Sequence, residues 1–155
     1  MKFATAIFGA IALVSSASSV QAQNFTFNAV ANPGVTVGGP DFRGDPVVGT
    51  YWTGTSTVTW ADGTKTTDKY TCISTTQPIN DKLFDAHTVC DGSSTEGTYS
   101  SVWGCQITSK DGMNMGCLGG LTGRTGRYAG KGGTITFMGR GGSGSGTGTW
   151  GPTAN

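Results

Sequence analysis

The residues best suited to chemistry lie in one glycine-rich stretch, residues 119–134 (GGLTGRTGRYAGKGGT). This stretch sets Tyr128 among three cations, Arg124, Arg127 and Lys131. Interior glycines cost a helix about 1 kcal/mol each relative to alanine. The stretch therefore predicts a sharply turning connection between strands, or a place where a backbone or a ligand approaches closely.

Several catalytic patterns are incomplete in this chain. Residues 130–133, Gly-Lys-Gly-Gly, lack the Ser or Thr that follows the lysine of a phosphate-binding loop. A serine–histidine–aspartate triad would need His87, the only histidine, and no serine sits in a Gly-x-Ser-x-Gly elbow. Nothing in the spacing of the nine acids points to the paired carboxylates of a glycosidase. We therefore assign no catalytic residue from the sequence.

The rings and cations also allow the hypothesis of a ligand site. In an antiparallel barrel, inward side chains either fill the interior or enclose one small ligand. Walls from Trp103 and Tyr128, with Arg124, Arg127 and Lys131 at the rim, would suit an apolar molecule that carries a carboxylate. The simpler interpretation is that the rings fill the core and the cations keep a glycine-rich turn soluble.

The elements expected around this stretch are short strands. Glycine (27) and threonine (25) dominate the composition, and only 12% of residues are charged, against about 25% in typical domains. Residues 98–108 alternate most clearly, and the Asp-Gly pairs at 62–63 and 111–112 predict hairpin turns. We expect an all-β domain, a single antiparallel barrel of about eight strands in meander order, with a sandwich as the alternative.

Four cysteines, Cys72, Cys90, Cys105 and Cys117, predict two disulfides in an exported chain. A three-residue loop at 110–112 would pair residues whose numbers sum to 222, which places Cys105 opposite Cys117. A hairpin centred near residue 81 would place Cys72 opposite Cys90. We favour these pairs, and Cys90–Cys105 with Cys72–Cys117 is the alternative. The chain has no Cys-x-x-Cys, so we expect no metal site.

The N-terminus has the pattern of a secretory signal. Lys2 precedes an apolar run at 3–14, and Val20-Gln21-Ala22 predicts cleavage between Ala22 and Gln23. An uncleaved anchor is the alternative, but the run is shorter than the about 20 residues that span a bilayer. We expect 1–22 to be a signal peptide, 23–46 a flexible lead-in with a possible first strand at 24–30, and 47–151 the barrel. The protein is then secreted or periplasmic.

Charge and composition also limit the partners. All nine acids lie between Asp41 and Asp111, and the four cations after Gly112 are too sparse for a nucleic-acid surface. No later stretch is apolar enough for a membrane helix, so we expect no membrane contact after signal removal. We expect no cofactor, and the oligomeric state stays open.

Residues 125–134, TGRYAGKGGT, resemble the GGTG-[RK]-[YF]-x-G-x-x-G signature of the allene oxide cyclase-like and dirigent-like barrel proteins. The best match spans residues 115–137, and Arg124 departs from it at a position that is usually glycine. The resemblance implies an antiparallel barrel of about eight strands whose glycine-rich turn links two late strands. Many members are small exported bacterial proteins without an assigned activity. Plant members cyclise a fatty-acid epoxide or orient phenolic radicals, mainly by shaping an apolar cavity, and none of their catalytic residues can be matched here.

These observations favour an exported, non-enzymatic barrel that binds a small apolar or amphipathic ligand. An isomerase- or cyclase-type enzyme is the first alternative. It would need a polar pair inside the barrel, such as Tyr99 or Tyr70 with an acid or Asn114. A surface interaction module, assembled through the glycine-rich residues 139–155, is the second alternative.

Overall fold

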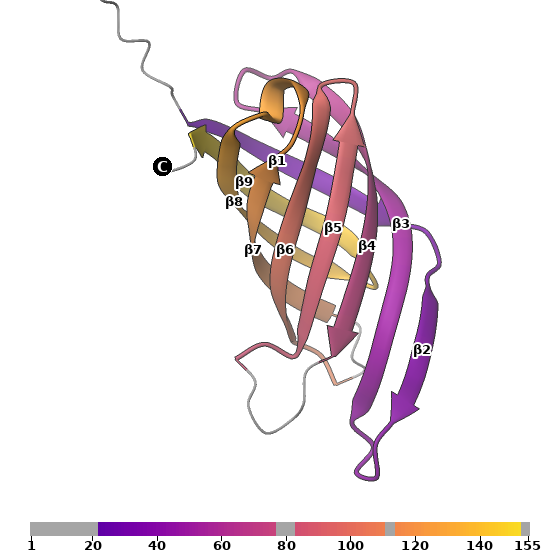
Figure 1. The fold of residues 1–155 in the computed structure, drawn as a ribbon. Coiled ribbons are helices and arrows are strands. Elements are labelled where there is room, and N and C mark those ends of the chain that lie inside the picture. The colour runs from indigo at the N-terminus through magenta and orange to yellow at the C-terminus, as the bar shows by residue number, and fades with distance from the viewer. Residues whose placement is uncertain (1–21, 77–82, 111–113, 153–155) are drawn as a thin grey trace, which may run out of the picture.

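The computed structural model describes residues 22–76, 83–110 and 114–152, and they form one antiparallel barrel with an added strand (Figure 1). The strands are β1 (Gln23–Ala31), β2 (Val35–Pro40), β3 (Pro46–Trp60), β4 (Lys65–Thr76), β5 (Ala86–Ser94), β6 (Gly97–Ile107), β7 (Asn114–Gly123), β8 (Lys131–Arg140) and β9 (Ser143–Pro152). Successive strands pair from β2 to β9, and β1 closes the barrel by pairing with both β9 and β3. The all-β, eight-stranded meander barrel expected from the sequence is thus confirmed. Within the described residues, no helix has the length and hydropathy needed to cross a membrane.

The N-terminal part differs from the sequence prediction. The strand expected at 24–30 is confirmed as β1, but it is a barrel strand, flanked on both sides, and no lead-in. Residues 35–40, expected to be loop, form β2 on the first half of β3. Pro40 and Pro46 face each other where the β2–β3 turn begins, and Gly38 takes a φ of +101°. Prolines are tolerated there because β2 is an edge strand outside the barrel.

Aromatic rings inside the barrel lie over glycines of the neighbouring strand. Five opposed pairs bring an inward ring against a glycine of the next strand: Phe25–Gly148, Phe27–Gly146, Tyr70–Gly54, Tyr99–Gly92 and Trp103–Gly119. A Cβ atom at any of these glycines would press against the facing ring. Much of the glycine content therefore makes room for large rings inside a narrow barrel.

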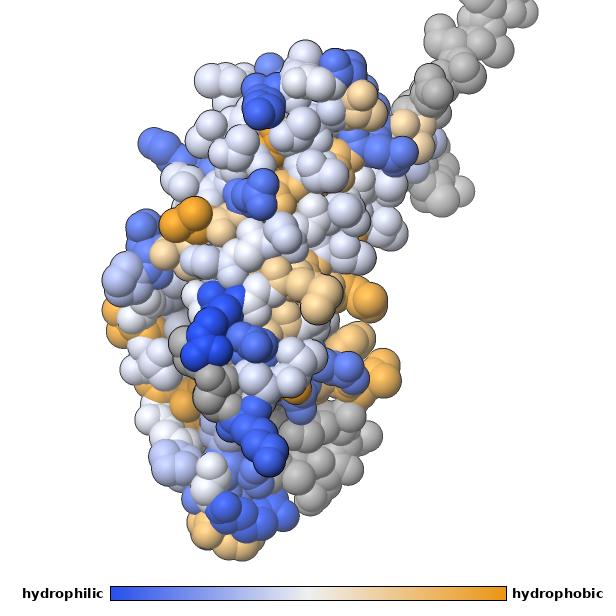
Figure 2. Space-filling view, turned by 180° about the vertical axis from the view of Figure 1, so that it is seen from behind, coloured by the Kyte–Doolittle hydropathy of each residue, from blue (hydrophilic) through white to orange (hydrophobic). Residues whose placement is uncertain are grey.

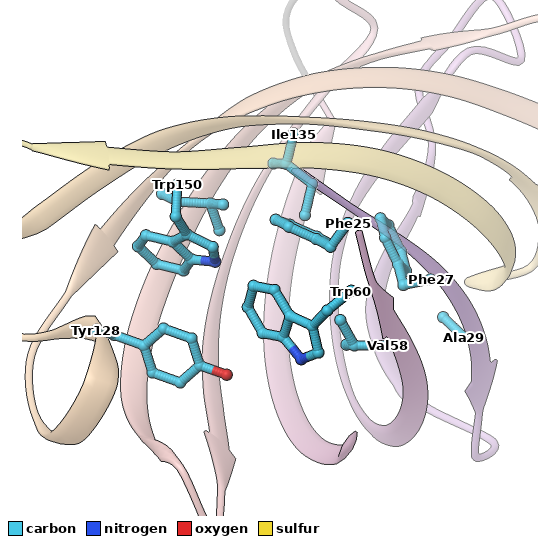
Figure 3. Packing of buried hydrophobic residues seen from close by; sticks show 9 residues of the cluster. Phe25, Phe27, Ala29, Val58, Trp60, Tyr128, Ile135 and Trp150 are labelled. Carbon is cyan, nitrogen blue, oxygen red and sulfur yellow. The ribbon is translucent and has the colours of Figure 1, made fainter. Parts of the chain in front are cut away.

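The rings form one continuous core along the barrel (Figure 3). Tyr128 and Trp150 lie at one end of it, with ring centroids 5.0 Å apart, and Phe27 and Ala29 lie toward the other end. Trp60 lies between them, 6.3 Å from Tyr128. Aromatic pairs at such distances add about 0.5–1.5 kcal/mol to the stabilisation from burial alone.

Both disulfides favoured from the sequence are present, Cys72–Cys90 and Cys105–Cys117. Each joins directly opposed residues of neighbouring strands, with Cα atoms 4.1 Å apart. All four sulfur-bearing side chains face the barrel interior, where they border the same cavity. The bonds are those of a protein that folds in an oxidising environment.

The outer face carries the threonines. Cross-strand hydroxyl pairs run along it, including Thr134 with Thr149 at 3.2 Å and Thr136 with Thr147 at 3.0 Å. Figure 2 shows hydrophilic residues interspersed with smaller groups of hydrophobic ones over one side of the molecule. Paired β-branched hydroxyl residues stabilise neighbouring strands and keep the surface polar, which explains the high threonine count.

Candidate functional site

One end of the barrel, here called the plugged end, is covered by the glycine-rich stretch. Its first residues extend β7, its last residues begin β8, and a short 3-10 turn, η2 (Gly126–Tyr128), joins them above the barrel (Figure 1). The turn is fixed to the β5–β6 hairpin, where the Arg127 N–H donates to the Glu96 carbonyl at 2.8 Å. Gly97 and Gly126 both have positive φ, and a Cβ on either would collide with the facing backbone. The expected strand-linking turn is therefore also a plug.

Tyr128 is the side chain that this turn inserts into the barrel. It is 1% exposed, and its ring meets the edge of Tyr99 at 5.2 Å. Outside it, the Arg127 guanidinium lies 4.0 Å from the Trp60 ring centroid and 3.0 Å from Glu96 Oε2. A cation–π contact and an ion pair thus hold the plug from the solvent side.

Beneath the plug, the barrel encloses an apolar cavity of about 110 Å³. All four tryptophans of the chain border it, Trp52, Trp60, Trp103 and Trp150, together with both disulfides. The polar groups on its wall are few, and two of the hydroxyl groups have hydrogen-bond partners. The Ser101 hydroxyl accepts from Trp103 Nε1 at 2.8 Å, and the Thr88 hydroxyl donates to Ser74 Oγ at 2.8 Å.

The exception on this wall is a carboxyl group, Asp68 of β4, which is 1% exposed. Its Oδ2 accepts a hydrogen bond from the Tyr99 hydroxyl at 2.8 Å, across the intervening β5. The small Gly92 of β5 leaves room for the Tyr99 ring to reach it. Asp68 Oδ1 has no hydrogen-bond partner in the part of the chain that the structure describes. A buried polar atom without a partner is uncommon in folded proteins.

Burial raises the pKa of Asp68 above its ordinary value, and the hydroxyls of Tyr99 and Thr66 oppose this rise by a smaller amount. The charge of Glu96 raises the pKa of Asp68 further. Burial, followed by the neighbouring Asp68, raises the pKa of the Tyr99 phenol far above its ordinary value. Tyr99 is therefore a neutral hydrogen-bond donor, and Asp68 is a carboxyl whose neutral form the barrel favours.

The other end, here called the mouth, is bounded by the β8–β9 turn, the end of β6 and the beginning of β7. Trp103, Phe137 and Met115 are only partly buried there. The Tyr70 hydroxyl donates a long hydrogen bond of 3.5 Å to the carbonyl of Gly142 in the β8–β9 turn. These side chains are less buried than Tyr128 and Trp150 at the plugged end.

The structure separates the candidate site residues into two groups. Trp103 and Tyr128 border the cavity, as a ligand site would require. Arg124 lies outside it, with Nη2 3.0 Å from Asp91 Oδ1, and Lys131 Nζ donates to Gln23 Oε1 at 3.3 Å. Arg127 covers the plug from outside, so none of the three cations borders the cavity. Their role at a ligand rim stays a prediction.

Asp68 and its hydrogen bond to Tyr99 were not singled out from the sequence. The strand at 64–75 alternates, and this alternation sets Asp68 on the same face as Tyr70 and Cys72. A carboxylate on the inward face of an alternating strand was therefore detectable. His87, by contrast, is exposed on the outer face with Val89, as the alternation predicts.

Metal binding finds no support in the described residues, which contain no cluster of three or more His, Cys, Asp or Glu side chains suited to an ion. No protein-family model, no curated protein and no solved structure matches the chain. The site must therefore be interpreted from its own geometry.

Proposed function

We propose that the protein is an exported barrel that binds one small, mainly apolar molecule in its interior. The observation that carries the proposal is the cavity of about 110 Å³, which is bordered by aromatic rings and by both disulfides. Apolar cavities of about 150 Å³ can bind benzene-sized molecules in place of water. A ligand with one ring, or a short chain that extends toward the mouth, suits this space.

Export is supported by two independent features. The disulfides require an oxidising compartment to form and persist. The first strand begins at Gln23, the residue expected to follow signal cleavage, so removal of residues 1–22 would leave the barrel whole. Residues 125–134 resemble a motif of the allene oxide cyclase-like and dirigent-like barrels. This resemblance, which depends on the motif alone, agrees with an apolar ligand.

The tryptophans provide the test, because all four border the cavity. We expect toluene to change the intrinsic fluorescence of the folded protein in a saturable way. Ala29, a small residue on the cavity wall, gives the blocking variant. The larger side chain of Ala29→Leu should occupy part of the cavity and weaken toluene binding at least tenfold, which corresponds to about 1.4 kcal/mol of binding free energy.

The matched control is Val30→Leu, on the same strand but on the outer face, where Val30 is 63% exposed. It should leave toluene binding unchanged. A fluorescence change that does not saturate, or one that Ala29→Leu and Val30→Leu affect equally, would remove the support for an interior site.

A second candidate, an isomerase- or cyclase-type enzyme, is favoured by one observation. The Tyr99–Asp68 pair is the tyrosine-with-acid arrangement that such an enzyme needs inside its cavity. A carboxyl with a raised pKa beside a neutral phenol is suited to proton transfer. Turnover of an apolar epoxide or enone that Asp68→Asn abolishes, with toluene binding intact, would favour this candidate over pure binding.

A further inference from the structure

The unpaired oxygen of Asp68 indicates which kind of ligand the cavity takes. Asp68 is 1% exposed, it borders the cavity, and Oδ1 has no hydrogen-bond partner among the described residues. Tyr99 satisfies only Oδ2. Leaving a buried acceptor unsatisfied costs free energy that a bound donor would recover.

The surroundings of this oxygen favour a cationic donor. The described residues that border the cavity include acidic and neutral side chains but no Lys, Arg or His. The other groups that act on Asp68 are Tyr99 of β6, Thr66 of its own strand and Glu96 of the β5–β6 turn, and none of them is positive. Arg127, a cation at this end, lies over the outside of Trp60 and pairs with Glu96. The positive charge must therefore come with the ligand.

Aromatic rings supply the second half of such a site. Tyr128 and Trp150 lie at the plugged end of the cavity, and Trp60 lies next to Tyr128. Tyr99 meets Tyr128 and Trp150 edge-on at 5.2 and 5.7 Å. Faces of Trp and Tyr attract ammonium groups, and the attraction grows when water is excluded. A carboxylate combined with several rings is a suitable environment for an organic ammonium ion.

We propose that the ligand is a small organic amine, a single ring or short apolar body that carries an ammonium group, and that this group pairs with Asp68 Oδ1. The inference rests on the proposed function, because it names the class of molecule that the cavity binds. It differs from the sequence-based hypothesis of a ligand carboxylate at a cationic rim, since the ionisable group on the cavity wall is a carboxyl group and not a cation.

The test compares four probes that share one ring: benzylamine, benzyl alcohol, toluene and benzoate. Each is titrated into the wild-type protein at the same pH, followed by calorimetry and by tryptophan fluorescence. Benzylamine should bind at least about tenfold more tightly than benzyl alcohol, because a charge-assisted hydrogen bond is roughly twice as strong as a neutral one. Benzoate should bind most weakly.

Two variants locate the preference. Asp68→Asn should reduce the preference for benzylamine over benzyl alcohol to within about twofold and leave toluene binding in place, because the amide keeps the size but loses the charge. Asp91→Asn is the matched control. It removes an exposed carboxylate of the outer face and should retain the preference.

The comparison of the four probes on the wild-type protein tests the amine proposal even if Asp68→Asn fails to fold. If toluene binds and benzylamine binds no better than benzyl alcohol, the amine proposal is overturned while the binding function stands. If none of the four probes binds, both are overturned. The affinity for benzylamine should also rise with pH until Asp68 is fully ionised, and the affinity for toluene should not. A pH-independent benzylamine affinity over that interval would contradict the pairing.

Discussion

The plugged end and the mouth of this barrel are stabilised in different ways. At the plugged end, large rings are packed against one another, and Tyr128 comes from a turn outside the sheet. Toward the mouth, Trp103 and Phe137 are only partly buried, and Cys105–Cys117 joins neighbouring strands covalently. Packing fixes the first end, whereas a covalent link holds the second where less surface is buried.

The difference sets a closely packed end against an end whose described rings are more exposed. Asp68 and Tyr99 lie near the packed end, so their hydrogen bond is held by surroundings that do not need to move. Tyr70 makes only one long hydrogen bond across the mouth, to Gly142. A ligand that entered from the mouth would pass this long hydrogen bond and meet the carboxyl group beside the closely packed rings.

The largest expected effect separates the two ends directly. Tyr128→Ala removes the buried plug ring and should lower the free energy of unfolding by about 3–5 kcal/mol. Met115→Ala, at the partly buried mouth, should cost clearly less, about 1–2 kcal/mol. Denaturant unfolding of both variants measures the difference, and equal losses would contradict the division into two ends.

The disulfides come next. Replacing Cys105 and Cys117 together by alanine should lower the free energy of unfolding by about 2–4 kcal/mol, because a loop with a sequence separation of 12 is no longer closed in the unfolded chain. Hydrogen exchange should accelerate most at the amides of β6 and β7 near the mouth, such as Ile107, and least near Leu121. Uniform acceleration along both strands would show that the bridge does not act locally.

The glycine–ring pairs give a matched comparison of intermediate size. Gly92→Ala sets a Cβ against the Tyr99 ring and should destabilise the barrel by about 1–3 kcal/mol. Gly116→Ala, on β7, meets no atom within 4 Å and should be neutral or slightly stabilising. Thermal unfolding of the two variants checks this, and an equal cost would mean that the glycines serve the backbone and not the rings.

Asp68 predicts a smaller dependence of stability on pH. Because burial raises its folded-state pKa, the unfolded chain ionises first as the pH rises above the ordinary value of 3.8. The contribution of Asp68 to stability is then fully present below that value and is lost as the pH rises through the folded pKa, by at most about 1.4 kcal/mol per pH unit. Asp68→Asn should remove this part of the pH profile, which urea unfolding at several pH values would measure. An unchanged profile would contradict a raised pKa.

The smallest effect is expected outside the cavity. Arg124→Ala breaks an exposed ion pair with Asp91 and should cost less than about 1 kcal/mol. It should also leave toluene and benzylamine affinities unchanged, because Arg124 does not border the cavity. A clear loss of affinity would show that Arg124 contributes to ligand binding, as the hypothesis of a cationic rim requires.

Local patterns predicted much of the fold. Alternation set Tyr99, Trp103 and Cys105 on one face, and the pairing of opposed residues in a hairpin gave both disulfides before any strand order was known. These features depend on short-range geometry. The closure of the barrel by β1 depends on pairings between residues more than a hundred positions apart, and no local pattern encodes it.

The site was harder to predict for the same reason. The alternation of β4 is enough to set Asp68 inward, although it was not used to predict the site. The partner of Asp68, Tyr99, lies two strands away and reaches it because Gly92 has no side chain. From the sequence the glycines were interpreted as turn residues, whereas several lie within strands and leave room for an aromatic ring of the next strand. Such cross-strand complementarity is visible only once the register is known.

Xenon binding to a crystal of the protein tests the central claim, a ligand cavity inside the barrel, most directly. Xenon enters apolar cavities of this kind without needing a particular functional group. The account predicts one strong anomalous peak inside the barrel, within contact distance of Trp103 and Ile135, which both border the cavity. An interior without xenon, filled instead by side chains or by ordered water, would contradict it.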